Sequence, residues 1–421
     1  QNDDKKLLGQ VTECINGYPD PTYGLLKRPG MKHTNVLKKA NGTAFTKAEL
    51  DGAAWFFIER DAAGSYIGAI KGANVYVWTT ADGTWCTVTN NGASYLTGTT
   101  QNDYHFRSVQ DVTVITNKTV TTAMQPAGSF VSSAVATLRL VALVNTYSYQ
   151  VTIQNIVTTV TAQNSTTFDD MLIYNSGNVN NTHHLVDAIK ATIEAQHAAS
   201  NANFAGTWYL EGYTNSLVIK RTTGSNTVVT NYSAPTGTEV AFTIEAKGGL
   251  GNTSLEVFED DINDIAELPV ESFHNHYVRV LNTDSADDDY HLKYVAYNGL
   301  RGRGYWKETV ARDASPGLDA ATMPYQLENT GALTFAFNPI PWKAREAGDD
   351  VTSPLPSFIG HPVQASFFYS NRFGLLSQDN VIFGVANDTF NFFVKSALTQ
   401  IDSDPIDLNV SSIRPVTLSD V

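Results

Sequence analysis

Four aspartates crowd one short stretch of the chain and are the clearest candidates for metal chemistry. They are Asp284, Asp287, Asp288 and Asp289. Carboxylate oxygens this close together could hold a hard cation such as calcium. The stretch lacks the central glycine and the closing glutamate of a helix-loop-helix calcium site. A solvated hairpin loop is therefore the preferred interpretation, and metal binding is the alternative.

Three histidines in the same region could supply imidazole ligands. His274 and His276 alternate onto one face of an expected strand, and His291 could reach them across a hairpin. A three-imidazole metal site is the functional interpretation. Exposed or half-buried histidines that bind no metal are far commoner on strands, so this is the preferred interpretation.

The segment 299–304, with the sequence GLRGRG, superficially resembles a nucleic-acid loop. Arg301 and Arg303 could pair with phosphates, and Tyr305 or Trp306 could stack on bases. The segment lacks the Lys-Ser or Lys-Thr of a phosphate loop. A hairpin turn with two exposed arginines is the preferred interpretation.

Two further carboxylates, Asp402 and Asp404, precede Pro405. They could form a metal-binding pair, but Asp before Pro in a turn needs no cation. The sequence contains no nucleophile elbow, zinc-protease helix, Walker loop or dinucleotide fingerprint in the required form. Paired glycosidase carboxylates stay open, because folding sets their separation of about 5 to 9.5 Å. We predict no catalytic, cofactor-binding or metal-ligating residue, and no cofactor.

Composition favours a folded β protein that does not bind nucleic acid through its charge. The 421 residues exceed the usual single-core limit of about 250 to 300, so two domains or one large repeat architecture is expected. Thr, Asn, Gly and aromatic residues replace charged ones, which make up only 17%, and this mixture suits strands and turns. The net charge of −14 argues against phosphate neutralisation.

The cysteines and the apolar runs argue against a disulfide-stapled protein, a zinc protein and a membrane-spanning protein. Cys14 and Cys86 are too few for a disulfide framework or a zinc site, and we expect two small buried thiols. No apolar run approaches the roughly 18 residues of a membrane span, and the first residues do not have a signal-peptide layout.

Short strand-like runs separated by turn residues dominate both ends of the chain. The predicted strands of the first part are 55–58, 65–68, 74–78, 84–88 and 111–115. Those of the last part are 276–281, 291–297, 304–310, 333–337, 372–376, 381–385 and 390–394. A polar turn over 377–380 joins two of the last three runs, which together predict a β-meander. A long loop that contains Asp349 and Asp350 lies between Pro-rich segments and is a candidate functional surface or interface, and the sequence does not decide between the two.

The middle of the chain has a different composition. Its predicted strands are 138–144, 149–160, 208–210, 217–220 and 240–244, and segment 247–252 breaks the pattern. One helix is expected at about 182–198, capped by Asn181 or Thr182. The residues that fall on its apolar face are Leu185, Val186, Ile189 and Ile193. We therefore predict a mainly β fold in three parts, with an α+β domain at 131–268 inserted between β parts 1–130 and 269–421.

Segments at both ends also resemble a known family. Near one end the chain reads FFYSNRFGLLSQDNVIFGVANDTFNFF followed by DSDPIDL, and residues 15–29 read INGYPDPTYGLLKRP. Segments 289–297, 305–309 and 356–360 follow with similar spacing. Together they resemble the tail tubular protein B, or nozzle, family of short-tailed bacteriophages. Residues 131–267 match this family weakly.

The resemblance implies a fold and a function. It implies a propeller-like antiparallel body with an inserted platform-like domain, in a chain that forms the N-terminal half of a longer protein. It implies a structural virion protein and not an enzyme, made in the host cytoplasm and placed in the phage tail.

The resemblance also implies partners. They are other copies in a homohexameric ring, the tail adaptor protein (tail tubular protein A), the tail fibre protein, and genomic DNA that passes through without sequence-specific binding. The alternative is a polysaccharide-degrading or glycan-binding tail protein.

Overall fold

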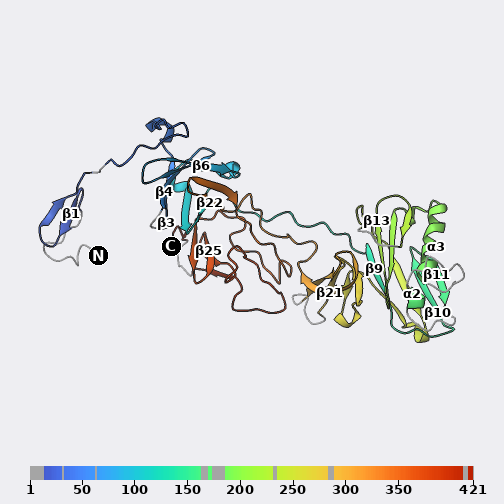
Figure 1. The fold of residues 1–421 in the computed structure, drawn as a ribbon. Helices are drawn as coiled ribbons and strands as arrows, with labels where there is room; N and C mark the ends of the chain where they lie inside the picture. Colours follow the sequence, from blue (N-terminus) through green and yellow to red (C-terminus); the bar gives the residue numbers. More distant parts are fainter. Residues whose placement is uncertain are drawn as a thin grey trace.

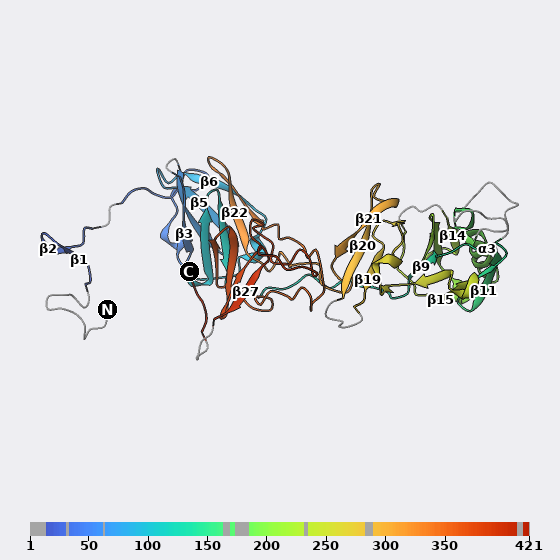
Figure 2. The ribbon, with the colours of Figure 1, turned by 90° about the horizontal axis from the view of Figure 1, so that it is seen from below.

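The computed structural model describes residues 14–30, 33–61, 64–162, 169–172, 185–230, 235–282, 289–410 and 416–420. Strands dominate these residues, which confirms the mainly β prediction. Both views show separate groups of strands arranged in a row (Figures 1 and 2). We name them the arm, the body, the middle module and the far module. The propeller arrangement and the three domain limits stay predictions.

The arm is a two-stranded hairpin that stands apart from everything else in both views. It consists of β1 (Gly17–Asp20) and β2 (Gly24–Lys27), paired antiparallel. The short helix α1 (Lys47–Leu50) follows the arm in the chain and begins with a capping box between Thr46 and Glu49.

An eight-stranded sheet forms the larger part of the body, in the order β3-β4-β5-β6-β23-β22-β8-β7. Its strands are β3 (Ala54–Asp61), β4 (Gly64–Lys71), β5 (Asn74–Thr79), β6 (Trp85–Asn90), β7 (Tyr104–Val109), β8 (Val112–Asn117), β22 (Tyr325–Gly331) and β23 (Thr334–Pro339). The turns between β6 and β7 contain the 3-10 helices η2 (Ala93–Tyr95) and η3 (Gln101–Asp103). All pairs are antiparallel except β6 with β23.

This sheet curls so that its two end strands approach each other. The rings of Phe56 on β3 and Phe106 on β7 stack with centroids 4.5 Å apart. The Gln101 side chain bridges the remaining gap, since it bonds both the backbone N–H and the carbonyl of Trp55, at 2.6 and 3.0 Å. The concave side holds a cluster of buried aromatic and branched residues. Curling therefore removes two sheet edges and encloses a core.

A four-stranded sheet completes the body, in the order β24-β25-β26-β27. Its strands are β24 (Ala365–Tyr369), β25 (Arg372–Ser377), β26 (Asn380–Phe383) and β27 (Ile406–Asn409). Ser377 pairs with Asn380, which confirms the turn predicted at 377–380. The predicted strand at 390–394 is wrong. Phe392 and Phe393 are buried one after the other, so the run does not alternate, and it packs as a loop near Trp342.

The middle module is a five-stranded sheet in the order β17-β19-β20-β21-β18, located between the body and the far module in both views. Its strands are β17 (Asp261–Ile262), β18 (Glu271–Phe273), β19 (Tyr277–Val280), β20 (Tyr290–Ala296) and β21 (Arg301–Thr309). The 3-10 helix η6 (Ile265–Glu267) connects β17 to β18.

The far module packs two sheets and two helices around one core. One sheet has the order β14-β12-β13-β9-β16 and the other β11-β10-β15. Its elements are β9 (Val135–Leu140), β10 (Ser148–Ile153), β11 (Ile156–Thr161), α2 (Asp169–Leu172), α3 (Leu185–Ala198), η4 (Ala202–Phe204), β12 (Thr207–Gly212), β13 (Ser216–Thr222), β14 (Thr227–Val229), β15 (Ile244–Gly248), η5 (Leu250–Asn252) and β16 (Leu255–Phe258).

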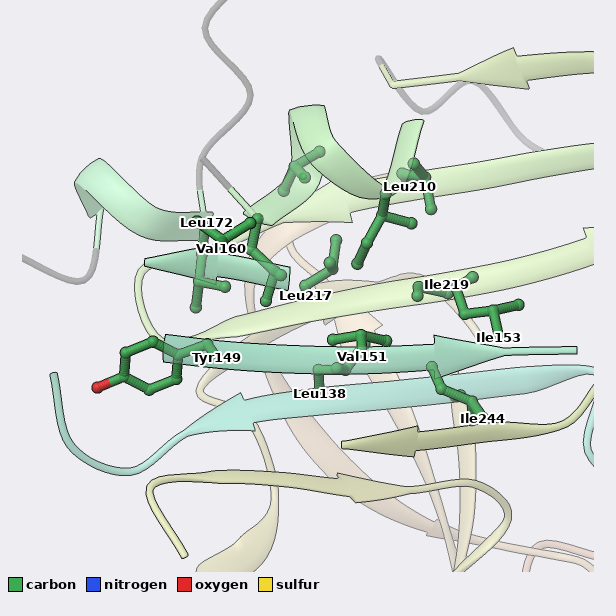
Figure 3. Packing of buried hydrophobic residues seen from close by; sticks show 14 of the residues in the cluster. Leu138, Tyr149, Val151, Ile153, Val160, Leu172, Leu210, Leu217, Ile219 and Ile244 are labelled. Atoms are coloured by element: carbon green, nitrogen blue, oxygen red, sulfur yellow. The ribbon is translucent and has the colours of Figure 1, made fainter. Parts of the chain in front are cut away.

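Apolar side chains from both sheets and from α3 form this core (Figure 3). The predicted helix face is confirmed, because its four members are fully buried: Leu185, Val186, Ile189 and Ile193. The predicted cap at Asn181 or Thr182 lies outside the described residues.

Four predictions in this module need correction. The strand predicted at 138–144 ends at Leu140, because the next two backbone N–H groups, those of Val141 and Ala142, turn to the Ser254 carbonyl. The run predicted at 149–160 is a hairpin, because Gln154 and Asn155 adopt φ of +48° and +66° and reverse the chain. Residues 240–243 are not in a strand, and β15 begins only at Ile244. The break predicted at 247–252 starts later, after Gly248, because Lys247 and Gly248 still pair with β10.

Candidate functional site

Only one aspartate of the predicted cluster can be placed. Asp284, Asp287 and Asp288 lie outside the described residues. Asp289 is buried, and its Oδ1 accepts a hydrogen bond of 2.7 Å from the backbone N–H of Asn282. Among the described residues no group of three His, Cys, Asp or Glu side chains is arranged to hold a metal ion. Asp289, the one described member of the cluster, therefore holds the backbone at Asn282 in place.

The three candidate histidines have separate surroundings. His276 Nδ1 lies 2.7 Å from Ser272 Oγ, and its ring stacks on Phe273. Burial lowers the pKa of His276 to about 3, so its imidazole is neutral at physiological pH. His291 Nδ1 instead lies 2.5 Å from the Tyr277 hydroxyl oxygen. Burial also lowers the pKa of His291.

His274 does not join them in a metal site. Its backbone N–H donates to the Leu300 carbonyl at 2.8 Å, and its Nδ1 is buried without a hydrogen-bond partner among the described atoms. The three histidines therefore do not form the three-imidazole site considered from the sequence, and the described residues contain no other group of this kind.

Only Gly299 and Leu300 of the GLRGRG segment lie in the turn, and the residues from Arg301 to Gly304 belong to β21. Arg301 forms an ion pair with Glu211 of the far module. Arg303 is 90% exposed and lies 3.9 Å from Glu271. The expectation of two exposed arginines is thus wrong for Arg301. Trp306 directs its Nε1–H to the Pro269 carbonyl at 3.0 Å, so its indole is used in packing.

The Asp402–Asp404 segment is a turn held by a buried arginine. The Arg372 guanidinium donates to four carbonyl oxygens at 2.6 to 3.2 Å, those of Gly384, Asp402, Ser403 and Asp404. The Asp404 carboxylate accepts a 2.8 Å bond from the backbone N–H of Ile401. The aspartates thus contribute carbonyls to a structural contact, and Arg372 on β25 fixes the loop that leads into β27.

A second buried arginine organises the long loop around Asp349 and Asp350. Arg345 donates to the Asp350 carboxylate at 2.7 Å and to the carbonyls of Asp349 and Ser353 at 2.6 and 2.7 Å. Its side chain is fully buried. We predicted a functional surface or interface here but not the arginine that holds the loop in place.

Charged and aromatic groups meet where the far module, the middle module and the connecting segments come together. The guanidinium carbon of Arg312 lies 4.6 Å from the ring centroid of Phe130 and 5.4 Å from that of Tyr277. It donates to Glu239 Oε2 at 2.6 Å, and Lys220 donates to Glu239 Oε1 at 2.8 Å. Burial alone would raise the pKa of Glu239, but the two cations lower it overall. We name these five residues the junction.

The cysteines differ from each other. Cys86 is buried, as expected, and burial raises the pKa of its thiol to about 11. Cys14 is exposed at the start of the arm, which corrects the prediction of two buried thiols.

A cavity of about 520 Å³ bears on the glycan-degrading alternative. Its lining includes Asp264 and Asp289. Asp264 Oδ1 accepts from the backbone N–H of Ala266 at 2.9 Å, and Asp289 bonds Asn282 as described. Both carboxylates therefore already stabilise backbone turns.

The chain belongs to the bacteriophage nozzle protein family, whose model matches residues 1–421. It is therefore a structural component of a phage tail. The chain is similar to tail tubular protein gp12 of Escherichia phage T7, with 24% identity over 424 aligned residues. The alignment covers 98% of this chain and 48% of the T7 protein, so the chain spans about half the length of the curated relative it matches.

None of the described helices is both long and apolar enough to cross a membrane.

Proposed function

We propose that this chain forms part of the wall of a short phage tail, in a ring of six copies around the channel through which the genome leaves. The family match over residues 1–421 is the observation that carries the proposal. The structure supports the proposal in a second way, since the curled eight-stranded sheet, the two buried arginines and the junction all stabilise the protein's own fold. In this proposal the protein acts through its shape and its contacts with other subunits.

Electron microscopy of the purified protein tests the ring directly. We expect closed six-fold rings, alone or on the adaptor. Heterologous contacts close such rings, and obligate contacts of this kind bury about 2,000 Å² or more. Monodisperse monomers that cleave or bind glycans would instead favour the polysaccharide-degrading or glycan-binding alternative.

The partners in the ring's surroundings follow from the same proposal. We infer that one face of the ring binds the tail adaptor protein and that its outside gives tail fibres a docking surface. Co-sedimentation of the protein with isolated adaptor rings and with fibres tests these contacts separately. Rings that sediment with neither the adaptor nor the fibres would agree with the proposed ring and contradict the proposed partners.

The charge supports a channel that releases its cargo. A net charge of −14 does not favour neutralisation of phosphates, and exposed like charges act within about 8 to 10 Å at physiological salt. We expect rings to retain no double-stranded DNA in a filter-binding assay at physiological salt. Tight, salt-sensitive retention would contradict the proposed passage.

A further inference from the structure

The arm has no core of its own. Ile15, Tyr23 and Leu25 are 76, 77 and 62% exposed. The first described residue that packs against a buried cluster is Leu37, beyond the arm. An isolated two-stranded hairpin is only marginally stable in water. The arm therefore needs a surface to cover it.

The two edges of the arm differ in their ability to pair. The backbone N–H of Arg28 donates to the Asn16 carbonyl at 2.8 Å. Because backbone groups alternate in direction along an antiparallel pair, Leu25 and Lys27 of β2 turn their N–H and C=O groups outward. On β1 the outward position opposite Leu25 is Pro19, which has no N–H. Thus β2 is the edge that can accept another strand.

The body offers a matching edge in β27. This strand is the last of its sheet and is exposed at every residue, with Ile406 and Leu408 at 38 and 55%. The backbone N–H of Val410 donates to the Asp379 carbonyl at 2.8 Å, so Asp407 and Asn409 turn their backbone groups outward. An exposed apolar strand edge invites pairing with another chain.

The β27 edge is held in place by neighbouring residues, and its charge is opposite to that of the arm. Arg372 holds the loop before β27, and the Asp407 carboxylate accepts bonds of 2.8 and 2.7 Å from Ser357. The edge is thus fixed in place before pairing. The arm carries Lys27 and Arg28, which complement the carboxylate of Asp407.

We propose that β2 of one copy adds as a fifth strand to β27 of a second copy. The arm projects away from its own body in both views, which favours a neighbour over the same chain (Figures 1 and 2). Each copy donates an arm and receives one, so the contact is heterologous and can repeat from copy to copy. The proposal does not depend on the number of copies, and rings could still form if it failed.

Thiol crosslinking between separately labelled copies tests the pairing. In the complete protein with Cys14→Ser, one preparation carries Leu25→Cys and another Asn409→Cys. After mixing and assembly, a short thiol crosslinker should give a covalent dimer that contains one of each. The control replaces Asn409→Cys by Val157→Cys, a residue 54% exposed on β11 of the far module.

A dimer yield no higher than that of the control would overturn the proposal. So would a double variant, Leu25→Cys with Asn409→Cys, that crosslinks only within one chain, since the arm would then cover its own body.

A proline substitution in the receiving strand β27 supplies a second measurement. Asn409→Pro removes the outward N–H while Leu408 and Val410 keep their bonds to the neighbouring chain segment. We expect self-association to weaken about fivefold to tenfold, which corresponds to the loss of one backbone hydrogen bond. Asn409→Ala loses the same side-chain contact with Asn380 and keeps the N–H, so it is the matched control. Equal association constants for the two variants, measured by analytical ultracentrifugation, would contradict strand addition.

Discussion

At the scale of single residues, the body depends on arginines that bind backbone carbonyls inside the protein. Arg372 and Arg345 are 8% and 4% exposed, and each satisfies several carbonyls that no strand partner reaches. A guanidinium suits this role because its donors form a rigid planar fork. Loops that look irregular in sequence are thus held as firmly as strands.

Removal of one such arginine should cost much of the stability of the body. We expect Arg372→Met to lower the free energy of unfolding by about 3 kcal/mol, because buried carbonyls lose their donors. Chemical denaturation checks this. Arg303→Met is the control, since that side chain is 90% exposed and only a small change is expected. Similar losses in the two variants would show that Arg372 does not stabilise the loop.

His276 should make stability depend on pH. Its pKa is about 3 in the folded protein and about 6.5 in an unfolded chain. The unfolded chain therefore binds the extra proton between these values, so stability is complete above about pH 6.5 and falls as pH decreases toward 3. The expected slope is about 1.4 kcal/mol per pH unit.

Unfolding free energies measured from pH 7 to pH 4 check this slope. His276→Gln should remove the contribution of His276, while His105 and His291, whose pKa values are also lowered by burial, keep theirs. His33→Gln is the control, because His33 lies exposed between the arm and the body. An unchanged slope in His276→Gln would mean that other groups cause the dependence.

At the scale of elements, both sheets of the body use the same device, a strand glycine covered by the ring of its cross-strand partner. Gly68 pairs with Phe56, and Gly374 pairs with Phe367. A Cβ at either glycine would come within 2.1 or 2.2 Å of the ring. The ring occupies the space that the missing side chain leaves and so fixes the register of the pair.

Gly374→Ala should therefore destabilise the four-stranded sheet by about 1 to 3 kcal/mol through overpacking. Thermal unfolding checks the cost. Phe367→Leu added to Gly374→Ala should restore part of the loss, because the smaller side chain frees space. Gly30→Ala is the control, since a Cβ there meets nothing within 4 Å. A double variant less stable than Gly374→Ala would contradict the steric explanation.

The sequence predicts local elements better than their partners. The apolar face of α3 and the turn at 377–380 follow from spacing and turn chemistry, and both are confirmed. The hairpin turn at Gln154 and Asn155 lacks glycine, so its signal is weak. The run at 390–394 has strand-like composition, but tertiary packing buries its adjacent phenylalanines together.

The candidate site was harder to anticipate. Of the carboxylates and histidines with suggestive spacing, Asp289 bonds a backbone N–H, and His276 and His291 lie within hydrogen-bond distance of hydroxyl groups. Arg372 and Arg345 gave no local signal, because their partners are carbonyls, which every residue carries. A charged residue among apolar ones, as in the run 372–376, is the single feature that could have drawn attention to Arg372.

At the scale of the whole molecule, the junction connects the far module to the middle module and to the segments that link both to the body. Glu239 joins Lys220 of the far module to Arg312 of the returning segment. Neutralising it leaves two cations close together. We expect Glu239→Gln to loosen this joint while each module stays folded.

Limited proteolysis and small-angle scattering check this expectation. Cleavage in the connecting segments near Phe130 and Arg312 should increase several-fold, and the particle's scattering profile should show a wider range of shapes. Glu245→Gln, on β15 within the far module, is a matched control. Unchanged cleavage in Glu239→Gln would show that packing of the rings around Arg312 is enough to hold the joint.

The order of strands in the eight-stranded sheet also governs how the protein is made. Strands β22 and β23 lie between β6 and β8, although residues 118–324 separate them from β8 in sequence. During synthesis, the two outer modules emerge complete before the central strands leave the ribosome. We therefore expect the eight-stranded sheet to keep open edges until residues 325–339 are released, and to close only after the middle and far modules have formed.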